Sequence, residues 1–180
     1  MNGNIFLNRD LAIPVYDNYG YTSIIAGRIT GIGNLTFSLY AGFRLAGATA
    51  NTYTGTTTVV SGTLELAKSA GVVAIPGDLV IGDGAGVDKV LVSQSGQITN
   101  TAQITINSNG VIDVSSGNYT FQNTFKGTGA IATGARTFTL GTSGVLSPGT
   151  NAVIGALSVT NLDFRGTVAF DYCKTGREAG

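Results

Sequence analysis

The acidic residues are the first place to look for chemistry in this chain, because it has no histidine and a single cysteine, Cys173. Without histidine, Ser-His-Asp catalysis is excluded, and most zinc and other transition-metal sites lack their ligands. Polysaccharide lyases and glycosidases instead use clustered or paired carboxylates. The acidic residues are scattered, however, and only Asp78, Asp83 and Asp88 gather near a base, Lys89. We therefore expect them to lie on solvated turns and expect no catalytic residues.

Residues 82–90 nearly reproduce the nonapeptide with which repeat-in-toxin proteins bind calcium, except that Asp83 stands where a glycine should be. Calcium in such repeats is held between two successive turns, and this chain carries one copy. Asp83 and Asp88 are thus a weak calcium candidate, and the favoured interpretation is a glycine-rich corner without metal. No cofactor is expected.

The composition indicates strands and tight turns. Hydrophobic residues make up 43% of the 180 residues and charged residues 11%, and there are 27 glycines. A typical soluble domain has roughly 25% charged residues, so Thr, Ser, Asn and Gln must cover much of this surface. Ten basic and ten acidic residues cancel without forming a basic patch, which argues against a nucleic-acid partner. No apolar run approaches the roughly 20 residues of a membrane-spanning helix.

Apolar residues alternate with polar ones in short runs, which is the pattern of half-buried strands. The alternating pairs are Leu64/Leu66, Leu79/Ile81, Val90/Val92, Ile104/Ile106, Ile112/Val114, Tyr119/Phe121, Phe138/Leu140, Leu157/Val159, Leu162/Phe164 and Val168/Phe170. Gly, Asn, Ser and Pro clusters separate them. An antiparallel sandwich has similar spacing, but asparagines at the turns and Thr or Ser in the polar positions favour stacked coils. The predicted fold is all-β, a right-handed single-stranded parallel β-helix (β-solenoid) with irregular rungs.

Two separated motifs occur in a characteristic order. The first is an Asn-Thr-Tyr-Thr-Gly-x-Thr segment followed by a Gly-x-Leu-x-Leu strand, and the second is a Ser-Pro-Gly turn followed by a strand. The residues that form the two motifs are Asn51, Thr52, Tyr53, Thr54, Gly55, Thr57, Gly62, Leu64, Leu66, Pro148 and Gly149. With them, residues 29–172 resemble the autotransporter-associated β-strand repeat, also called the passenger-associated transport repeat. One departure is Gly55-Thr56, where the family often has two glycines.

The resemblance implies a β-helix displayed on the bacterial surface or secreted, whose repeat aids export and folding of the passenger domain. Residues 1–4 lack the features of a signal peptide, so an exported protein would have this chain as one piece. The expected organisation is an N-terminal cap or preceding segment (1–28), the β-helix (29–172) and a C-terminal tail (173–180). We expect Tyr53 to pack inside rather than to contact a ligand, whereas the state of Cys173 stays open.

Function is expected to be structural and adhesive rather than enzymatic. The expected partners are further copies of the chain, through the solenoid ends or sides, and a host or matrix glycan or protein. Two alternatives remain open at this point: a carbohydrate-active β-helix (a lyase or hydrolase) and a trimeric fibre of the tailspike type.

Overall fold

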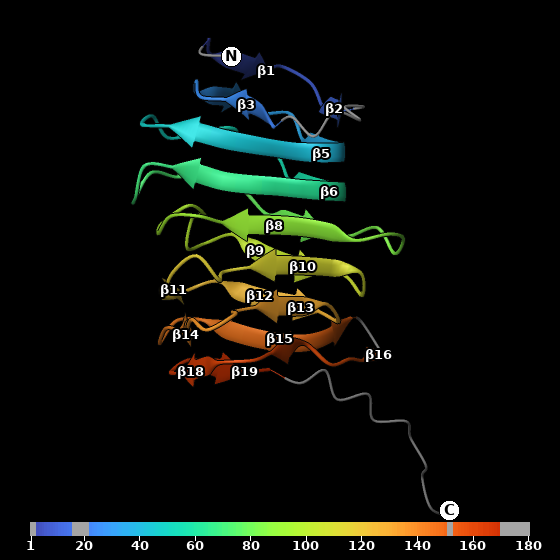
Figure 1. The fold of residues 1–180 in the computed structure, drawn as a ribbon, viewed down its shortest axis with the longest axis vertical. Helices are drawn as coiled ribbons and strands as arrows, with labels where there is room; N and C mark the ends of the chain where they lie inside the picture. The colour runs from blue at the N-terminus through green and yellow to red at the C-terminus, as the bar shows by residue number, and fades with distance from the viewer. Residues whose placement is uncertain (1–2, 16–21, 151–152, 170–180) are drawn as a thin grey trace, which may run out of the picture.

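The computed structural model describes residues 3–15, 22–150 and 153–169, and it shows an all-β solenoid of about seven coils (Figure 1). The strands lie one above another from the N-terminal to the C-terminal end of the stack, and no helix occurs among the described residues. Every strand pairing in this part of the chain is parallel except that of β15 with β16. Two facing antiparallel layers are thereby excluded, and the predicted parallel β-solenoid is confirmed.

The short strands of the coils form three columns, and we number the columns in chain order. Column 1 contains β1 (Ile5–Leu7), β4 (Ile29–Gly31), β11 (Tyr119–Phe121), β14 (Phe138–Leu140) and β18 (Leu162–Phe164). Column 2 contains β2 (Leu11–Val15), the first parts of β5 (Leu35–Gly47) and β6 (Thr57–Lys68), then β7 (Leu79–Ile81), β9 (Gln103–Ile106), β12 (Thr124–Gly127), β15 (Val145–Thr150) and β19 (Thr167–Val168). Column 3 contains β3 (Ser23–Ile25), the second parts of β5 and β6, then β8 (Asp88–Val92), β10 (Gly110–Asp113), β13 (Ala130–Ala132) and β17 (Ser158–Val159). The remaining strand, β16 (Val153–Ile154), pairs back on β15.

The core is a set of apolar ladders inside the stack. In column 2, Phe37, Val59, Ile81 and Ile106 occupy successive inward positions and are fully buried. Column 3 has an equivalent ladder through Leu64 and Val90. Because side chains alternate across a strand, each inward residue lies on the inward residue of the next coil, and burial is shared along the whole axis.

Glycines allow the coils to approach closely at one corner. A Cβ atom on Gly55 would lie 2.2 Å from the carbonyl oxygen of Gly33, and one on Gly77 would lie 2.6 Å from the carbonyl oxygen of Gly55. Since no side chain fits at such distances, the glycine of the Asn-Thr-Tyr-Thr-Gly motif is required by stacking. Any larger residue there would push adjacent coils apart.

The coils are irregular in length, as expected. Partners in column 1 are 24 residues apart between Ile5 and Ile29 but 19 apart between Tyr119 and Phe138. The described residues of segment 1–28 form the first coil, because β1, β2 and β3 pair with the strands that follow. Cys173, with the rest of segment 173–180, and Asn151 lie outside the described residues.

Candidate functional site

Asn51, the first residue of the repeat motif, connects three coils. Its side chain is 2% exposed; Oδ1 accepts the backbone N–H of Ile29 at 2.9 Å, and Nδ2 donates to the carbonyl oxygen of Ala74 at 2.8 Å. One partner belongs to the coil before and the other to the coil after. The motif asparagine therefore satisfies buried backbone groups that a sheet column leaves unpaired at this corner.

Tyr53 is also buried, as predicted, and its hydroxyl shares a 2.5 Å hydrogen bond with the Thr57 hydroxyl inside the core. Burial raises the pKa of Tyr53 well above its ordinary value, and the Thr57 hydrogen bond lowers it by less. The phenol is thus neutral at all ordinary pH values. It serves packing and offers no surface for a ligand.

The other motif residues divide between corners and core. Thr52 and Thr54 point outward, and the Thr52 hydroxyl accepts a hydrogen bond from the Arg28 guanidinium at 3.0 Å. Gly62 and Gly149 have positive φ, and Leu64 and Leu66 are fully buried. The predicted Ser-Pro-Gly turn is wrong, because Pro148 and Gly149 lie within β15, where the register with β12 shifts. The described motif residues thus form corners and core ladders, and they do not converge on a single cleft.

Lys68, at the end of β6, is a buried cation that the sequence analysis missed. Its side chain is 0% exposed, and its ammonium donates hydrogen bonds to backbone atoms of the two preceding coils. Nζ donates to the carbonyl oxygens of Gly27 at 3.3 Å, Ala46 at 2.9 Å and Thr49 at 2.9 Å. These three acceptors use all three ammonium donors. Burial lowers the pKa of Lys68.

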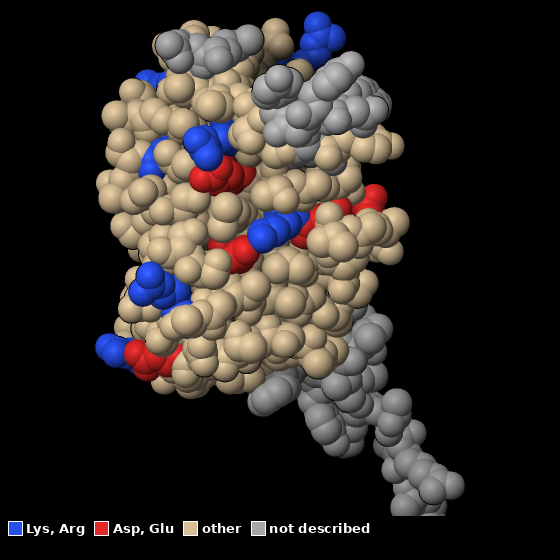
Figure 2. Space-filling model, in the orientation of Figure 1, with Lys and Arg blue, Asp and Glu red and all other residues tan. Residues whose placement is uncertain are grey.

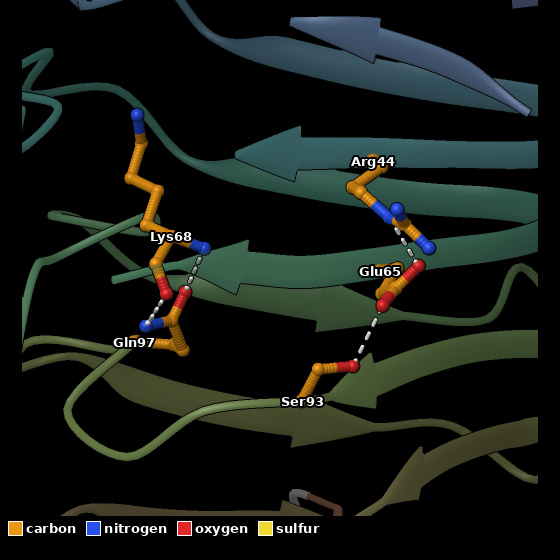
Figure 3. Close-up of polar contacts among 5 residues, drawn as sticks. All are labelled: Arg44, Glu65, Lys68, Ser93 and Gln97. Atoms are coloured by element: carbon orange, nitrogen blue, oxygen red, sulfur yellow. Dashed lines mark hydrogen bonds and ion pairs between the residues drawn. The ribbon is translucent and has the colours of Figure 1, made fainter. Parts of the chain in front are cut away.

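Gln97 holds the same corner from the following coil. Its Oε1 accepts the backbone N–H of Lys68 at 2.9 Å, while its Nε2 donates to the Lys68 carbonyl oxygen at 3.1 Å (Figure 3). The side chain is 2% exposed and replaces the strand pairing that ends at this point. Lys68 and Gln97 together, which we call the Lys68 corner, tie successive coils with fully partnered polar groups.

The outer surface of column 3 carries an ordered row of charges (Figure 2). Arg44 Nε lies 2.6 Å from Glu65 Oε2, and Glu65 Oε1 accepts from the Ser93 hydroxyl at 2.8 Å (Figure 3). Farther along the stack, Lys89 Nζ lies 2.6 Å from Asp113 Oδ2. Each of these contacts joins neighbouring coils, so the carboxylates cross-link strands by their side chains.

Burial raises the pKa of Asp113, but its contacts with Lys89 and Ser115 outweigh this, and the pKa is lowered. Asp113 is therefore a carboxylate at neutral pH. It is 8% exposed, and Asp88 is completely buried, so the prediction that all acidic residues lie on solvated turns is wrong for both. The error has a clear physical reason, because both residues lie in strands of column 3 whose neighbouring coils cover them.

Asp88 lies beneath the exposed loop of residues 83–87 at the start of β8. Its Oδ2 accepts from the Asp83 backbone N–H at 3.3 Å and from Asn109 Nδ2 at 2.6 Å. Its Oδ1 is buried and has no hydrogen-bond partner. Burial is the main reason that the pKa of Asp88 is raised; the two hydrogen bonds lower it, and the nearby Asp83 charge raises it further.

The described part of the chain offers little enclosed space. A crevice of about 30 Å³ lies near Gln97, Tyr119 and Asn123, which is room for about one water molecule. A shallow hollow of about 310 Å³ lies along residues 5–11 on the first coil. No helix among the described residues is long and apolar enough to cross a membrane, and no group of three or more His, Cys, Asp or Glu residues gathers there.

The burial of Lys68 and of Asp88 is visible in the sequence. Lys68 continues the alternation of Leu64 and Leu66, and Asp88 precedes Val90 and Val92 by the same step. The two-residue alternation of side chains along a strand therefore predicts that Lys68 and Asp88 point inward. The expectation of exposure followed instead from the general tendency of charged residues to lie at the surface.

No protein-family model, curated protein or solved structure matches this chain. The geometry of the coils and their polar corners is therefore the basis for the functional argument that follows.

Proposed function

We propose that this chain is a non-catalytic structural and adhesive segment of a bacterial protein of the autotransporter type, displayed on the cell surface or secreted. In this proposal its repeat motif aids passenger export by helping newly exported coils to stack. The observation that carries the proposal is Asn51, which satisfies backbone groups of the coils on both sides of its own. A residue of this kind acts when one coil docks on another, which is how a solenoid folds.

The proposal gains support from the use of the polar residues. Threonine and asparagine side chains at the corners accept or donate hydrogen bonds between coils. For example, Asn34 Oδ1 accepts the Thr56 N–H at 2.8 Å. The charged row of column 3 is likewise engaged in contacts between coils. A regular, extended outer surface of this kind suits a spacer or a binding surface better than a catalytic cleft.

The test compares Asn51→Ala with Asn34→Ala in cells that produce the full-length protein. Both changes remove an asparagine that links coils, but Asn51 is buried whereas Asn34 is exposed. Antibodies against residues 1–180 are applied to intact and to permeabilised cells. We expect wild type and Asn34→Ala to label on intact cells, and Asn51→Ala to label several-fold less.

Labelling of the wild type only after permeabilisation would refute surface display. Equal labelling of all three proteins on intact cells would refute the role of the motif in export. Adhesion is tested separately with beads that carry the purified chain, applied to immobilised host matrix proteins and glycans. Retention no greater than that of beads coated with an unrelated protein would contradict it.

Self-association through the solenoid ends belongs to the same proposal. In the last described coil, Leu162 and Phe164 continue the core ladder of Phe138 and Leu140, yet they are 41% and 42% exposed. Exposed core positions next to strand edges favour pairing with another chain. Light scattering over a wide concentration range tests this. We expect Phe164→Glu to reduce the association. A wild-type chain that is monomeric at every concentration would contradict self-association.

One observation favours an alternative, a carbohydrate-active β-helix. Glu65 and Asp113 both pair with Leu91 from opposite sides, so they lie two coils apart in one row, flanked by Arg44 and Lys89. Two strand spacings are about 9.5 Å, near the upper end of the carboxylate separation in inverting glycosidases. Cleavage of a pectin or glycan panel that Glu65→Gln abolishes would establish this alternative. The lowered pKa of Asp113 suits a base rather than an acid.

A further inference from the structure

The corner formed by residues 82–88 and the turn of the next coil contains a buried carboxylate oxygen without a partner. Asp88 is 0% exposed, and its Oδ1 accepts no hydrogen bond. Asp83 lies beside Asp88, since its backbone N–H donates to Asp88 Oδ2 at 3.3 Å. Among the described residues neither acid forms an ion pair, because the adjacent Lys89 is bound to Asp113 at 2.6 Å. Leaving a buried negative charge unpaired is costly.

The next coil closes this corner. Asn107 Nδ2 donates to the carbonyl oxygen of Gly82 at 2.6 Å, and Asn109 Nδ2 donates to that of Ala85 at 2.7 Å. Asn109 Oδ1 accepts the N–H of Gly84 at 3.0 Å. The loop is therefore clamped by a second, different turn. The sequence carries a single nonapeptide copy, and in the structure the turn of residues 107–110 takes the place of a second copy by covering the loop with these hydrogen bonds.

The loop also has the flexibility and donor chemistry of a hard-cation site. Gly82, Gly84 and Gly86 have positive φ, which lets the backbone fold over Asp88. The oxygen atoms near the corner that could bind a cation belong to the Asp88 carboxylate, the Asp83 carboxylate and the backbone carbonyl groups of the loop. Calcium prefers such oxygen ligands in flexible loops, whereas magnesium demands stricter octahedral geometry.

We propose that this corner binds a calcium ion, with Asp88 Oδ1 as the central ligand and Asp83 as the second carboxylate. The ion gives the orphaned oxygen its partner and neutralises two like charges at once. With only two carboxylates, the affinity falls in the range of extracellular calcium modules, a Kd on the order of 10⁻⁴ to 10⁻³ M. The site stands independently of the adhesive function, since it would stabilise any solenoid with this corner.

The experiment follows thermal unfolding of the full chain in EDTA, in excess CaCl₂ and in equal MgCl₂, with calorimetric titration of CaCl₂ alongside. The variants are Asp88→Asn and, as a matched control, Asp78→Asn. Asp78 is exposed, and its Oδ1 accepts the Gln103 N–H, a role that an asparagine oxygen preserves. Both variants lose one negative charge, but only the first removes the proposed ligand.

We expect calcium, and not magnesium, to raise Tm of the wild type and of Asp78→Asn. Asp88→Asn should weaken calcium binding by more than about tenfold. No calcium heat and no Tm shift in the wild type, an equal shift with magnesium, or an undiminished calcium response in Asp88→Asn would each overturn the proposal. If Asp88→Asn does not fold, Asp83→Asn replaces it; unchanged calcium affinity in that variant would count against the site.

Discussion

Two buried ionisable groups in neighbouring coils differ in whether their polar atoms have hydrogen-bond partners. The Lys68 ammonium has three carbonyl acceptors for its three donors. Gln97 also accepts a hydrogen bond from the backbone N–H of Lys68. The Asp88 carboxylate lies in an equally buried position of the same column, yet one of its oxygens has no partner. Burial alone therefore does not decide whether a charge stabilises a solenoid. What decides is whether the neighbouring coil supplies matching groups.

The largest expected effect is at the Lys68 corner. Lys68→Met keeps a long apolar stem but leaves the carbonyl oxygens of Gly27, Ala46 and Thr49 without their shared donor. We expect the free energy of unfolding to fall by about 3 kcal/mol, in line with losing hydrogen bonds to a buried charge. Urea unfolding measures the change, and Lys126→Met, which alters a partly exposed lysine of β12, is the control. Equal stability of Lys68→Met and wild type would mean that the hydrogen-bonded Lys68 ammonium does not stabilise the solenoid.

A smaller loss is expected from Gln97→Ala, which removes both hydrogen bonds to the Lys68 backbone. The buried N–H and C=O that remain unpaired cost about 2 kcal/mol together. The hydrogen-exchange rate of the Lys68 amide should also rise in Gln97→Ala, because this amide loses its acceptor. Gln94→Ala, at an exposed position nearby, is the control. If both alanine variants unfold at the same urea concentration, Gln97 has no special part in the corner.

In calcium-free buffer, we expect replacement of Asp88 to raise the free energy of unfolding and not to lower it. Its raised pKa means that the folded chain holds a proton at pH values where the unfolded chain has lost it. The stability that this proton provides is complete below the unfolded-state pKa and is lost as pH rises through the folded-state pKa. Asp88→Asn should therefore be more stable than wild type at pH 7, by on the order of 1 kcal/mol.

That advantage should shrink as pH is lowered toward the ordinary range of aspartate pKa values. Urea unfolding at several pH values, with EDTA throughout, checks it. Asp78→Asn should show no such trend relative to wild type. A constant difference between Asp88→Asn and wild type across the pH range would mean that Asp88 does not titrate differently in the fold.

The smallest effect is expected on the outer surface of column 3. Glu65→Gln removes the ion pair with Arg44 but keeps an oxygen for the Ser93 hydroxyl. Because the Arg44 side chain is 41% exposed, we expect a loss of about 0.5 kcal/mol, which high salt should reduce further. Thermal unfolding at low and high salt measures it. A loss as large as that of Lys68→Met would show that this row is more than a set of surface contacts.

The alternating pairs predicted much of the fold. Leu79/Ile81, Ile104/Ile106 and Phe138/Leu140 all lie in strands and are buried. Leu162 and Phe164 also form a strand, but they are largely exposed, because no described coil covers the far side of β18. Alternation predicts which way a side chain points along a strand, and the presence of a neighbour decides whether that direction is buried.

The repeat motif was recognisable as a unit, but its role was not. Asn51 bonds to Ile29 and Ala74, which lie 22 and 23 residues away. No local pattern identifies these partners, since they depend on the irregular length of each coil. The same is true of Asn109, whose bonds to Asp88 and to the loop above it span 21 to 25 residues.

The sequence by itself determined the all-β character, the short strands, the glycine and asparagine corners and the inward direction of Lys68 and Asp88. These features depend on local conformation and on period-two alternation, which neighbouring residues carry. Only the tertiary structure decided which backbone groups meet each inward charge. Coils of unequal length bring distant residues into register, so Lys68 finds three carbonyl groups while Asp88 Oδ1 finds none.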